Sequence, residues 1–167
     1  NKNQLISQLH WRDFYYNICF YKPHVIGNSL KEKYDKIKWE NDSKLFKKWK
    51  EGRTGYPVVD ACMTELNTTG YMHNRGRLIV ASFLVKILLI DWRKGEKYFA
   101  TKLVDYDPLV NNGNWQWVAG TGADSQPYFR IFNPWTQGKK FDKECKYIKK
   151  WIPELRDIPN KDIHEWD

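Results

Sequence analysis

The strongest constraint on the fold is a helix start in the second half of the chain, at Asp107-Pro108. Proline cannot continue a preceding helix but suits the first turn of a new one, and an aspartate before it can accept hydrogen bonds from the free N–H groups there. We therefore predict a helix that begins at Pro108 and carries Asn111, Trp115 and Trp117. Because Asn111 and Trp115 lie four residues apart, an amide and an indole project from neighbouring faces of this helix.

Glycines at 113, 120 and 122 accompany these side chains and leave room for a flat group to approach the backbone. One interpretation is a binding surface for a planar ligand. The alternative is a tightly packed helix whose tryptophans fill a core, although such helices are built mainly from aliphatic residues. Composition alone leaves both interpretations open.

The whole chain is basic and rich in aromatic residues. Its 167 residues suit one domain with a real core. A net charge of +8 favours a polyanionic partner, nucleic acid first and an anionic membrane surface second. Nine Trp, ten Tyr and eight Phe add surfaces on which bases can stack. A protein with a lysine-rich surface and no such partner is the alternative.

Three cysteines, an odd number without metal-ligand spacing, indicate neither a zinc site nor a disulfide framework. A reducing compartment is expected. The longest apolar run, residues 78–90, contains Lys86 and is too short to span a bilayer, so it predicts a buried helix and no membrane contact.

The hydrophobic pattern has helical periodicity throughout and no alternating segment, which predicts an all-α, multi-helical fold. We expect helices at residues 5–21, 57–66, 74–90 and 95–104, and another that begins at residue 108. The last helix is expected to follow Asp142, which would cap it. Residues 27–53 are expected to form surface loop and short helix, with Trp39 and Trp49 as isolated anchors. Pro127, Pro134 and Gly138 indicate a long connection before the last helix.

Two helices carry polar side chains that could face a cleft. On the first, Gln8, Trp11, Arg12 and Tyr15 fall along one side, with a core helix and an edge arginine as the alternative. On the helix from Asn74, the residues beside the free N–H groups of the first turn are Asn74, Arg75 and Arg77, and Leu78 follows one turn after Asn74. A helix N-terminus of this kind readily binds an anion or a polar ligand.

Eight segments together resemble the photolyase/cryptochrome family in order and near its spacing. They are WRDFY (11–15), TGYPVVDA (54–61), GYMHNR (70–75), SFL (82–84), DWR (91–93), NNG (111–113), WQW (115–117) and PYFRIFNP (127–134). The resemblance covers nearly the whole chain. It implies the helical flavin-binding domain of a protein that uses light to split ultraviolet-made pyrimidine dimers in DNA, and it is closest to class I cyclobutane pyrimidine dimer photolyases.

The resemblance also implies roles for particular residues. FAD is the implied cofactor, with Asn111 facing the flavin N5 and an Arg77–Asp105 pair packed against the ring. The implied FAD-binding residues are Arg12, Arg77, Asp105, Tyr106, Asp107 and Asn111. The implied electron-carrying tryptophans are Trp115, Trp92 and Trp39. The implied contacts to the dimer and the DNA backbone are Gln8, Trp11, Asn74, Arg75, Leu78, Trp117 and Gln137.

Three positions depart from the family pattern. Gln8 stands where enzymes acting on cyclobutane dimers usually have Glu, Leu78 where Met is usual, and Tyr106 where a small residue is usual. Enzymes acting on six-four photoproducts share the Gln but carry histidines where this chain has Asn74 and Leu78. Asn74 therefore favours cyclobutane dimers, while Gln8 and Leu78 could weaken binding.

The resemblance places residues 1–167 in the C-terminal portion of the flavin domain. We expect the N-terminal antenna domain and the segment that wraps the flavin phosphates to be absent, so the missing N-terminal half is a candidate partner. Three functions stay open: a DNA-repair enzyme, a cryptochrome-like light receptor, and a flavin-free DNA-binding remnant. All three imply an intracellular protein with access to DNA, in the nucleus or the cytoplasm.

Overall fold

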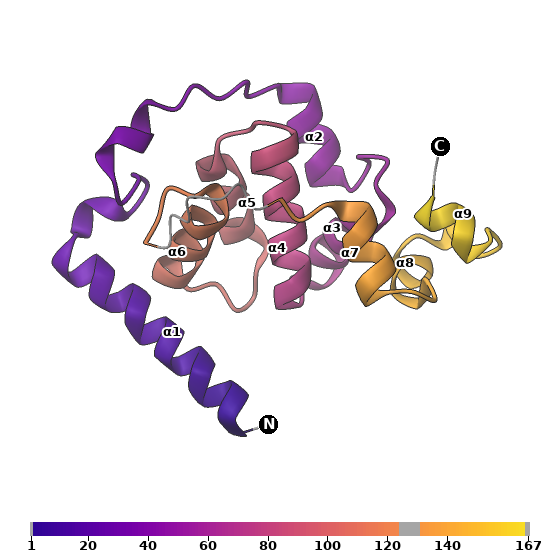
Figure 1. The fold of residues 1–167 in the computed structure, drawn as a ribbon, viewed down its shortest axis with the longest axis horizontal. Coiled ribbons are helices and arrows are strands. Elements are labelled where there is room, and N and C mark those ends of the chain that lie inside the picture. The colour runs from indigo at the N-terminus through magenta and orange to yellow at the C-terminus, as the bar shows by residue number, and fades with distance from the viewer. Residues whose placement is uncertain (1, 124–130, 166–167) are drawn as a thin grey trace.

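A computed structural model describes residues 2–123 and 131–165, and in these residues the chain forms helices and no strand (Figure 1). This confirms the all-α prediction. The longer helices are α1 (Lys2–Tyr21), α2 (Ser43–Glu51), α3 (Pro57–Thr69), α4 (Asn74–Ser82), α5 (Trp92–Lys102), α6 (Pro108–Ala119), α7 (Pro134–Phe141), α8 (Lys146–Trp151) and α9 (Asn160–His164). The short ones are the 3-10 turns η1 (Pro23–Val25), η2 (Glu32–Lys36) and η4 (Pro153–Leu155), and the π-helical turn η3 (Phe83–Ile87).

Helix α6 begins where the sequence predicts. The Asp107 carboxylate accepts hydrogen bonds from the N–H groups of Leu109 and Val110, both at 3.0 Å, and Gly120 ends the helix in the left-handed conformation. The flat group that approaches Gly113 belongs to the chain itself. A Cβ on Gly113 would lie 2.2 Å from the ring of Tyr15 on α1, so this glycine allows α1 and α6 to pack closely.

The core is built around three aromatic side chains from α2, α5 and α6. Trp49 is fully buried, stacks on Phe99 with 6.2 Å between ring centroids, and donates from Nε1 to the Val80 carbonyl at 3.0 Å. Trp115 meets both rings edge-on, at 6.2 Å from Trp49 and 5.0 Å from Phe99. Both interpretations of Trp115 therefore apply at once, because this indole fills the core and, as shown below, also lines a cavity.

The helix expected over residues 74–90 is shorter than predicted. Helix α4 passes at Phe83 into the π-helical turn η3, where the Leu88 N–H donates to the Phe83 carbonyl. Leu89 then has a positive φ of 51°, which ends the helix before Ile90. Lys86 in this turn donates to the Ala119 carbonyl at 3.0 Å, and its burial lowers its pKa. No helix in the described part of the chain combines the length and apolarity that a bilayer span requires.

Other helix boundaries also differ from the predictions. Helix α5 begins at Trp92 and not at Gly95, because the Asp91 side chain caps it. Part of the long connection is helix α7, which has Pro134 in its first turn and the Asn133 side chain as its cap. The capping role predicted for Asp142 is confirmed, since its carboxylate accepts from two N–H groups of α8. Helix α8 is not the last, since α9 follows it.

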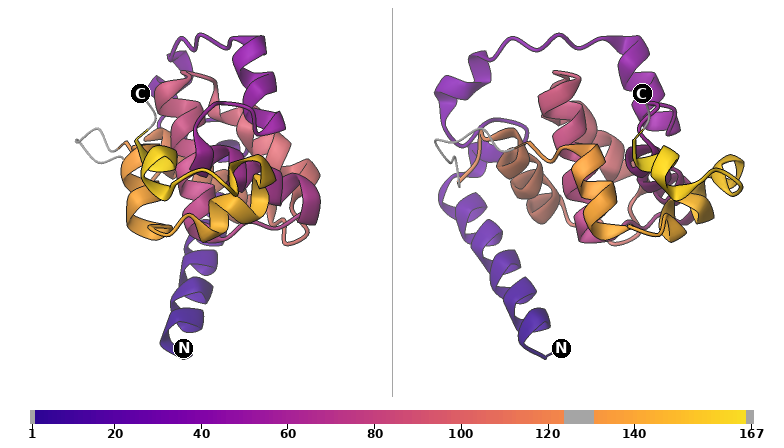
Figure 2. Two further views of the ribbon diagram at one scale, coloured as in Figure 1. Left: turned by 90° about the vertical axis from the view of Figure 1, so that its right-hand side faces the viewer. Right: turned by 45° about the vertical axis from the view of Figure 1, so that its right-hand side comes forward.

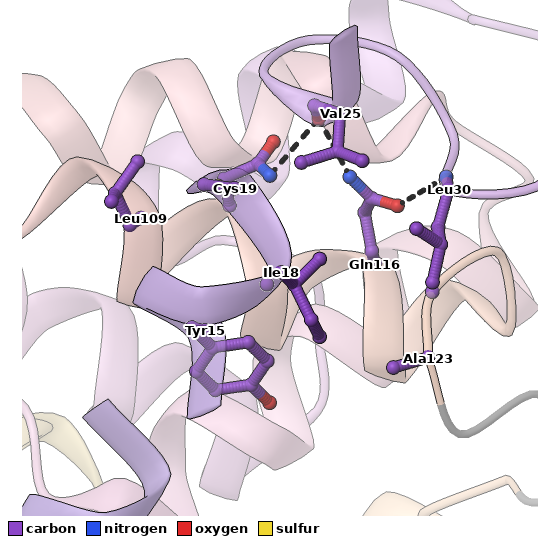
Figure 3. Close-up of a pocket in the computed structure, with 11 residues that line it drawn as sticks. Tyr15, Ile18, Cys19, Val25, Leu30, Leu109, Gln116 and Ala123 are labelled. Atoms are coloured by element: carbon purple, nitrogen blue, oxygen red, sulfur yellow. Dashed lines mark hydrogen bonds between the residues drawn. The ribbon is translucent and has the colours of Figure 1, made fainter. Parts of the chain in front are cut away.

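Two buried amides of α6 hold the loop that follows α1. Gln116 donates from Nε2 to the Val25 carbonyl at 2.9 Å, and its Oε1 accepts from the Leu30 N–H at 2.9 Å (Figure 3). The same Nε2 also donates to the Asn28 carbonyl at 2.9 Å. Asn112 donates to the same Val25 carbonyl at 3.1 Å. These amides satisfy backbone groups that would otherwise be buried without partners.

Candidate ligand cavity

A cavity of about 980 Å³ lies between α1, α4, α5 and α6. This volume is at the upper end of the range for small-molecule and cofactor sites, roughly 300–1,000 Å³. Many of the residues singled out in the sequence line it together. They are Gln8, Arg12, Asn74, Arg77, Leu78, Asp105, Tyr106, Asp107, Asn111 and Trp115. The three helices that carry most of them are far apart in the chain, so the fold brings these side chains into one site.

An ion pair forms one wall of the cavity. Nη2 of Arg77, on α4, donates to both carboxylate oxygens of Asp105, at 3.0 and 2.8 Å. Nε of the same guanidinium donates to the Met72 carbonyl at 2.7 Å, and the group lies 5.7 Å from the Tyr71 ring centroid. Because three partners fix the guanidinium, its positive charge has a defined place in the cavity.

The Asp107 carboxylate joins α1 to α6. One oxygen caps α6, while the other accepts from the Tyr16 hydroxyl at 2.9 Å and lies 3.8 Å from Nε of Arg12. The Arg12 guanidinium also lies over the Tyr16 ring, 5.2 Å from its centroid. Sequence reasoning did not identify Tyr16, because its partner is 91 residues away.

Asn111 is oriented by a residue that the sequence analysis missed. Its Nδ2 donates to Oε1 of Glu96 at 3.0 Å and to the Glu96 backbone carbonyl at 3.2 Å. With the amino end of the amide held in this way, its carbonyl oxygen is the end available as an acceptor. Burial and the nearby Glu96 carboxylate also raise the pKa of Tyr106.

Of the three tryptophans predicted to carry electrons, only Trp115 lines the cavity. Trp92 is buried elsewhere in the core, has an Nε1 without a hydrogen-bond partner among the described residues, and lies under the Arg93 guanidinium, 5.0 Å from it. Trp39 is half-buried and packs against the core. The tryptophan in ring contact with Trp115 is Trp49, which the sequence indicated only as an isolated anchor.

Four residues predicted to contact DNA or the dimer lie outside the cavity lining. Trp11 is 48% exposed on α1, and Trp117 is half-buried against the core. Arg75 lies between two phenylalanines, 5.8 Å from the Phe132 ring centroid and 4.6 Å from that of Phe141. Gln137 on α7 is half-buried, and its Oε1 has no hydrogen-bond partner in the described part of the chain. No group of three or more potential metal ligands is present among the residues described.

A large cavity walled by a fixed ion pair, an oriented amide and an indole gives this all-α domain the size and the mixed polar and apolar lining of a ligand or cofactor site. The model of the family described as the FAD binding domain of DNA photolyase matches residues 5–167. The chain therefore belongs to this family, as the resemblance implied.

Similar proteins agree with this assignment. The deoxyribodipyrimidine photo-lyase of Escherichia coli is 53% identical over 161 residues, which are 96% of this chain and 34% of that protein. The photolyase of Sulfolobus tokodaii, whose structure contains two FAD molecules, is 56% identical with a TM-score of 0.93 over 96% of this chain and 37% of that one. A Synechocystis cryptochrome is 43% identical with a TM-score of 0.92, over 97% of this chain and 33% of that one. The chain thus spans about a third of the length of these relatives.

Proposed function

We propose that this chain supplies the C-terminal portion of the catalytic flavin domain of a DNA photolyase, an enzyme that repairs cyclobutane pyrimidine dimers in DNA using light. The observation that carries the proposal is the composition of the cavity. Arg77, Asp105 and Asn111 suit a flavin ring, and Gln8 and Asn74 line the same cavity with amides suited to base edges.

The residues present fit FAD as the cofactor. The cavity has room for an isoalloxazine, the Arg77 charge would favour an anionic reduced flavin, and the Asn111 carbonyl oxygen would accept from a ring N–H. Arg12, Tyr106 and Asp107 would complete the FAD-binding wall. When bound, FAD supplies the light-excited electron that splits the dimer. The chain's own residues, Arg77, Asp105 and Asn111, would orient this group.

We propose that electrons reach the cavity from the surface through Trp39, Trp92 and Trp115. Their burial supports this order, because Trp39 is half-buried, Trp92 is 1% exposed, and Trp115 is 2% exposed and lines the cavity. The large aromatic surface of each indole and the burial of the inner two suit electron transfer.

The substrate would be a dimer turned out of the duplex, as enzymes acting on bases require. Gln8, Asn74 and Leu78 would contact it from inside the cavity, with the amides reading base edges. Trp11 and Trp117 would supply aromatic surface beside it, and the DNA-backbone contacts proposed for Arg75 and Gln137 lie on α4 and α7. Asn74 supports cyclobutane dimers over six-four photoproducts.

Because the chain spans about a third of its relatives, we propose that it is the C-terminal portion of the flavin domain. The antenna domain and the segment that wraps the flavin phosphates would then lie outside these 167 residues, in a partner or elsewhere in a longer chain. The protein would work in an intracellular compartment that contains DNA.

A cryptochrome-like light receptor is the second candidate, favoured by the likeness to the Synechocystis cryptochrome. The amide at Asn111 and the amides of Gln8 and Asn74 favour repair, since a receptor that leaves DNA unchanged needs no dimer site.

The experiment that tests the proposal begins with an absorption spectrum of the purified protein mixed with FAD. The FAD-loaded protein, reduced beforehand, is then given a duplex with one cyclobutane dimer, in blue light and in the dark. We expect repair of the dimer in blue light and none in the dark. FAD binding without repair would support the receptor. A protein that binds DNA but takes up no FAD would support the flavin-free remnant.

Binding of the protein to the damaged duplex and to the same duplex without damage is measured at two salt concentrations. The comparison separates charge-driven binding to the phosphates from recognition of the dimer. Without FAD we expect salt-sensitive binding with little preference for damage, because the packing around Asn74 is incomplete. A tenfold preference in the flavin-free chain, about 1.4 kcal/mol, would show instead that the dimer pocket is already formed.

A further inference from the structure

Helices α2 and α5 concentrate positive charge. Their 20 residues include eight Lys or Arg side chains and two acidic ones. Both acids already have partners, because Glu51 lies 3.9 Å from Lys47 and Glu96 accepts from the Asn111 amide. Eight positive and two negative charges leave +6 on these two helices, compared with +8 for all 167 residues. A small part of the chain therefore carries a net charge close to that of the whole protein.

Two rows of side chains join these helices into one surface. Lys94, Tyr98 and Lys102 follow one another at four-residue spacing on α5, and Phe46 and Lys50 do so on α2. Lys94 and Lys50 lie 5.9 and 5.0 Å from the Phe46 ring centroid. Lys50 and Lys102 lie 5.9 and 5.6 Å from that of Tyr98. We call these five residues the lysine face, and in the described part of the chain no carboxylate pairs with its three lysines.

The lysine face lies beside Trp39. The Asp91 N–H donates to Oδ1 of Asn41 at 3.0 Å, which holds the segment after Trp39 against the start of α5. Lys94 follows one turn later, with its N–H bonded to the Asp91 carbonyl at 3.0 Å. Asp42 caps α2, so the same segment leads directly into the other helix of the face. Trp39, which is half-buried, is therefore the partly exposed member of the proposed tryptophan chain and neighbours the lysine face.

The lysine face and the cavity lie on different sides of α5. Phe99 lines the cavity, whereas the adjacent Tyr98 belongs to the lysine face. Among the described residues that line the cavity, none belongs to α2. In Figures 1 and 2, α2 lies at the upper edge of the molecule, and the N-terminal end of α1, whose Leu5 and Gln8 line the cavity, lies at the lower edge. A duplex that presents a dimer to the cavity therefore does not need the lysine face.

We propose that the lysine face is the docking site of an acidic one-electron carrier protein that delivers electrons to Trp39. Complementary charge selects an acidic partner and steers its approach. The rings of Phe46 and Tyr98 between the lysines supply the aromatic centre that protein interfaces favour. Electron carriers bind through small, transient interfaces, which a surface on two short helices can provide. The inference rests on the proposed order of electron transfer through Trp39, Trp92 and Trp115.

The carrier and the chain exchange electrons one for one. When light-driven reduction of bound FAD has drawn one electron through the tryptophans, Trp39 is left one electron short. The docked carrier returns that electron and is itself oxidised by one electron. No covalent bond forms or breaks, and an indole proton lost to solvent in the meantime returns from solvent.

The first test measures docking without FAD and in the dark. The probe is an oxidised plant-type ferredoxin with many surface carboxylates, and calorimetry gives its affinity at about 0.02 and 0.15 M salt. We expect binding that weakens as the salt rises. At the lower salt, Lys94→Glu and Lys50→Glu, one on each helix, should each weaken binding at least about tenfold. Lys143→Glu makes the same charge change at an exposed lysine between α7 and α8, and should weaken binding less than about threefold.

The second test follows electron delivery to the FAD-loaded protein in blue light. Oxidation of reduced ferredoxin, measured by its own absorbance, should be at least about tenfold slower with Lys94→Glu than with the parent. Dithiothreitol is an uncharged reductant that needs no lysine face, so with it both proteins should accept electrons at the same rate. Equal rates with ferredoxin would show that the lysine face does not guide the carrier.

Three binding results would overturn the proposal: no salt-sensitive binding of ferredoxin, equal weakening by Lys143→Glu and Lys94→Glu, or a tenfold loss of affinity for undamaged duplex DNA in Lys94→Glu, which would assign the face to DNA. Urea unfolding checks that Lys94→Glu keeps the stability of the parent, as expected for an exposed side chain. The first test needs neither FAD nor light, so failure of docking is distinguishable from failure of the proposed function.

Discussion

Nη2 of Arg77 donates to both carboxylate oxygens of Asp105, although the two residues lie 28 positions apart and on separate elements. This pair places one fixed cation and one anion at the cavity wall. Nε of the arginine is already engaged by the Met72 carbonyl. A ligand that meets this wall therefore meets a charge whose position is set before binding, which lowers the cost of ordering the site.

Replacing Asp105 with Asn should weaken FAD binding about threefold to tenfold. The Asp105 carboxylate is half-exposed, so removing its charge should cost only about 1 kcal/mol of binding free energy. The substitution also leaves the Arg77 guanidinium without its ion-pair partner. Titration of the protein with FAD, alone or with the remainder of the photolyase, measures the effect. Glu165→Gln is the control, because it removes a pair of similar length, Lys139–Glu165 at 2.9 Å, that lies outside the cavity. Equal affinities for parent and Asp105→Asn would exclude a role for this pair.

Trp115→Phe should abolish light-driven reduction of bound FAD by an external reductant, while repair from flavin reduced beforehand persists. Time-resolved absorption measures the first, and dimer loss measures the second. Trp49→Phe is the matched control, because Trp49 is buried in the same cluster and contacts Trp115 but does not line the cavity. The Trp49→Phe variant should lose about as much stability as Trp115→Phe and should keep the light-driven reduction of FAD. Undiminished photoreduction in Trp115→Phe would rule out the proposed chain of tryptophans.

Gly95→Ala should destabilise the fold by about 1–3 kcal/mol through overpacking. A Cβ at this position would lie 2.3 Å from Cη2 of Trp115 and 2.6 Å from Cδ2 of Leu84, distances that real contacts do not reach. Gly138→Ala on α7 is the control, since the nearest atom to its Cβ would be 3.5 Å away, and it should be neutral or stabilising by up to about 1 kcal/mol. Urea unfolding of both variants gives the comparison, and equal midpoints would contradict the close packing of Trp115 and Leu84 against Gly95.

Gln116→Glu should cost about 1–3 kcal/mol at neutral pH, because a carboxylate accepts from Leu30 but cannot donate to the carbonyls of Val25 and Asn28. Burial should raise the folded-state pKa of this new acid above its unfolded value, so the loss should shrink as pH falls and the acid takes up a proton. Thermal unfolding at two pH values measures this. Asn114→Asp on the exposed side of α6 should show neither effect.

The sequence predicts helix starts well where a cap and a proline coincide, as at Asp107-Pro108. The same signal occurs at Asn133-Pro134, but Pro127 and Gly138 outweigh it and favour a connection, so the sequence does not predict α7. The end of the helix from Asn74 could not be predicted, because a π-helical turn depends on how Phe83 packs in the core and not on a local residue pattern.

The candidate site shows the same division between local and long-range information. The family resemblance singled out ten of the residues that line the cavity, but not Glu96, whose contact with Asn111 is made across two helices. Nor could spacing show that Trp49 is the tryptophan in ring contact with Trp115. Periodicity shows which face of a helix is buried, while its partner on another helix depends on tertiary packing.

The Asp107 carboxylate contacts two helices, because it caps the first turn of α6 and accepts a hydrogen bond from Tyr16 on α1. If α1 moves away, the Tyr16 hydroxyl leaves one oxygen of that carboxylate, and the cap on the N–H groups of Leu109 and Val110 loses its support. The exchange of these two amide hydrogens with solvent deuterium thus reports on the position of a helix to which neither amide belongs. Hydrogen exchange at these two backbone positions, which no ligand needs to touch, would therefore show whether α1 stays packed against α6.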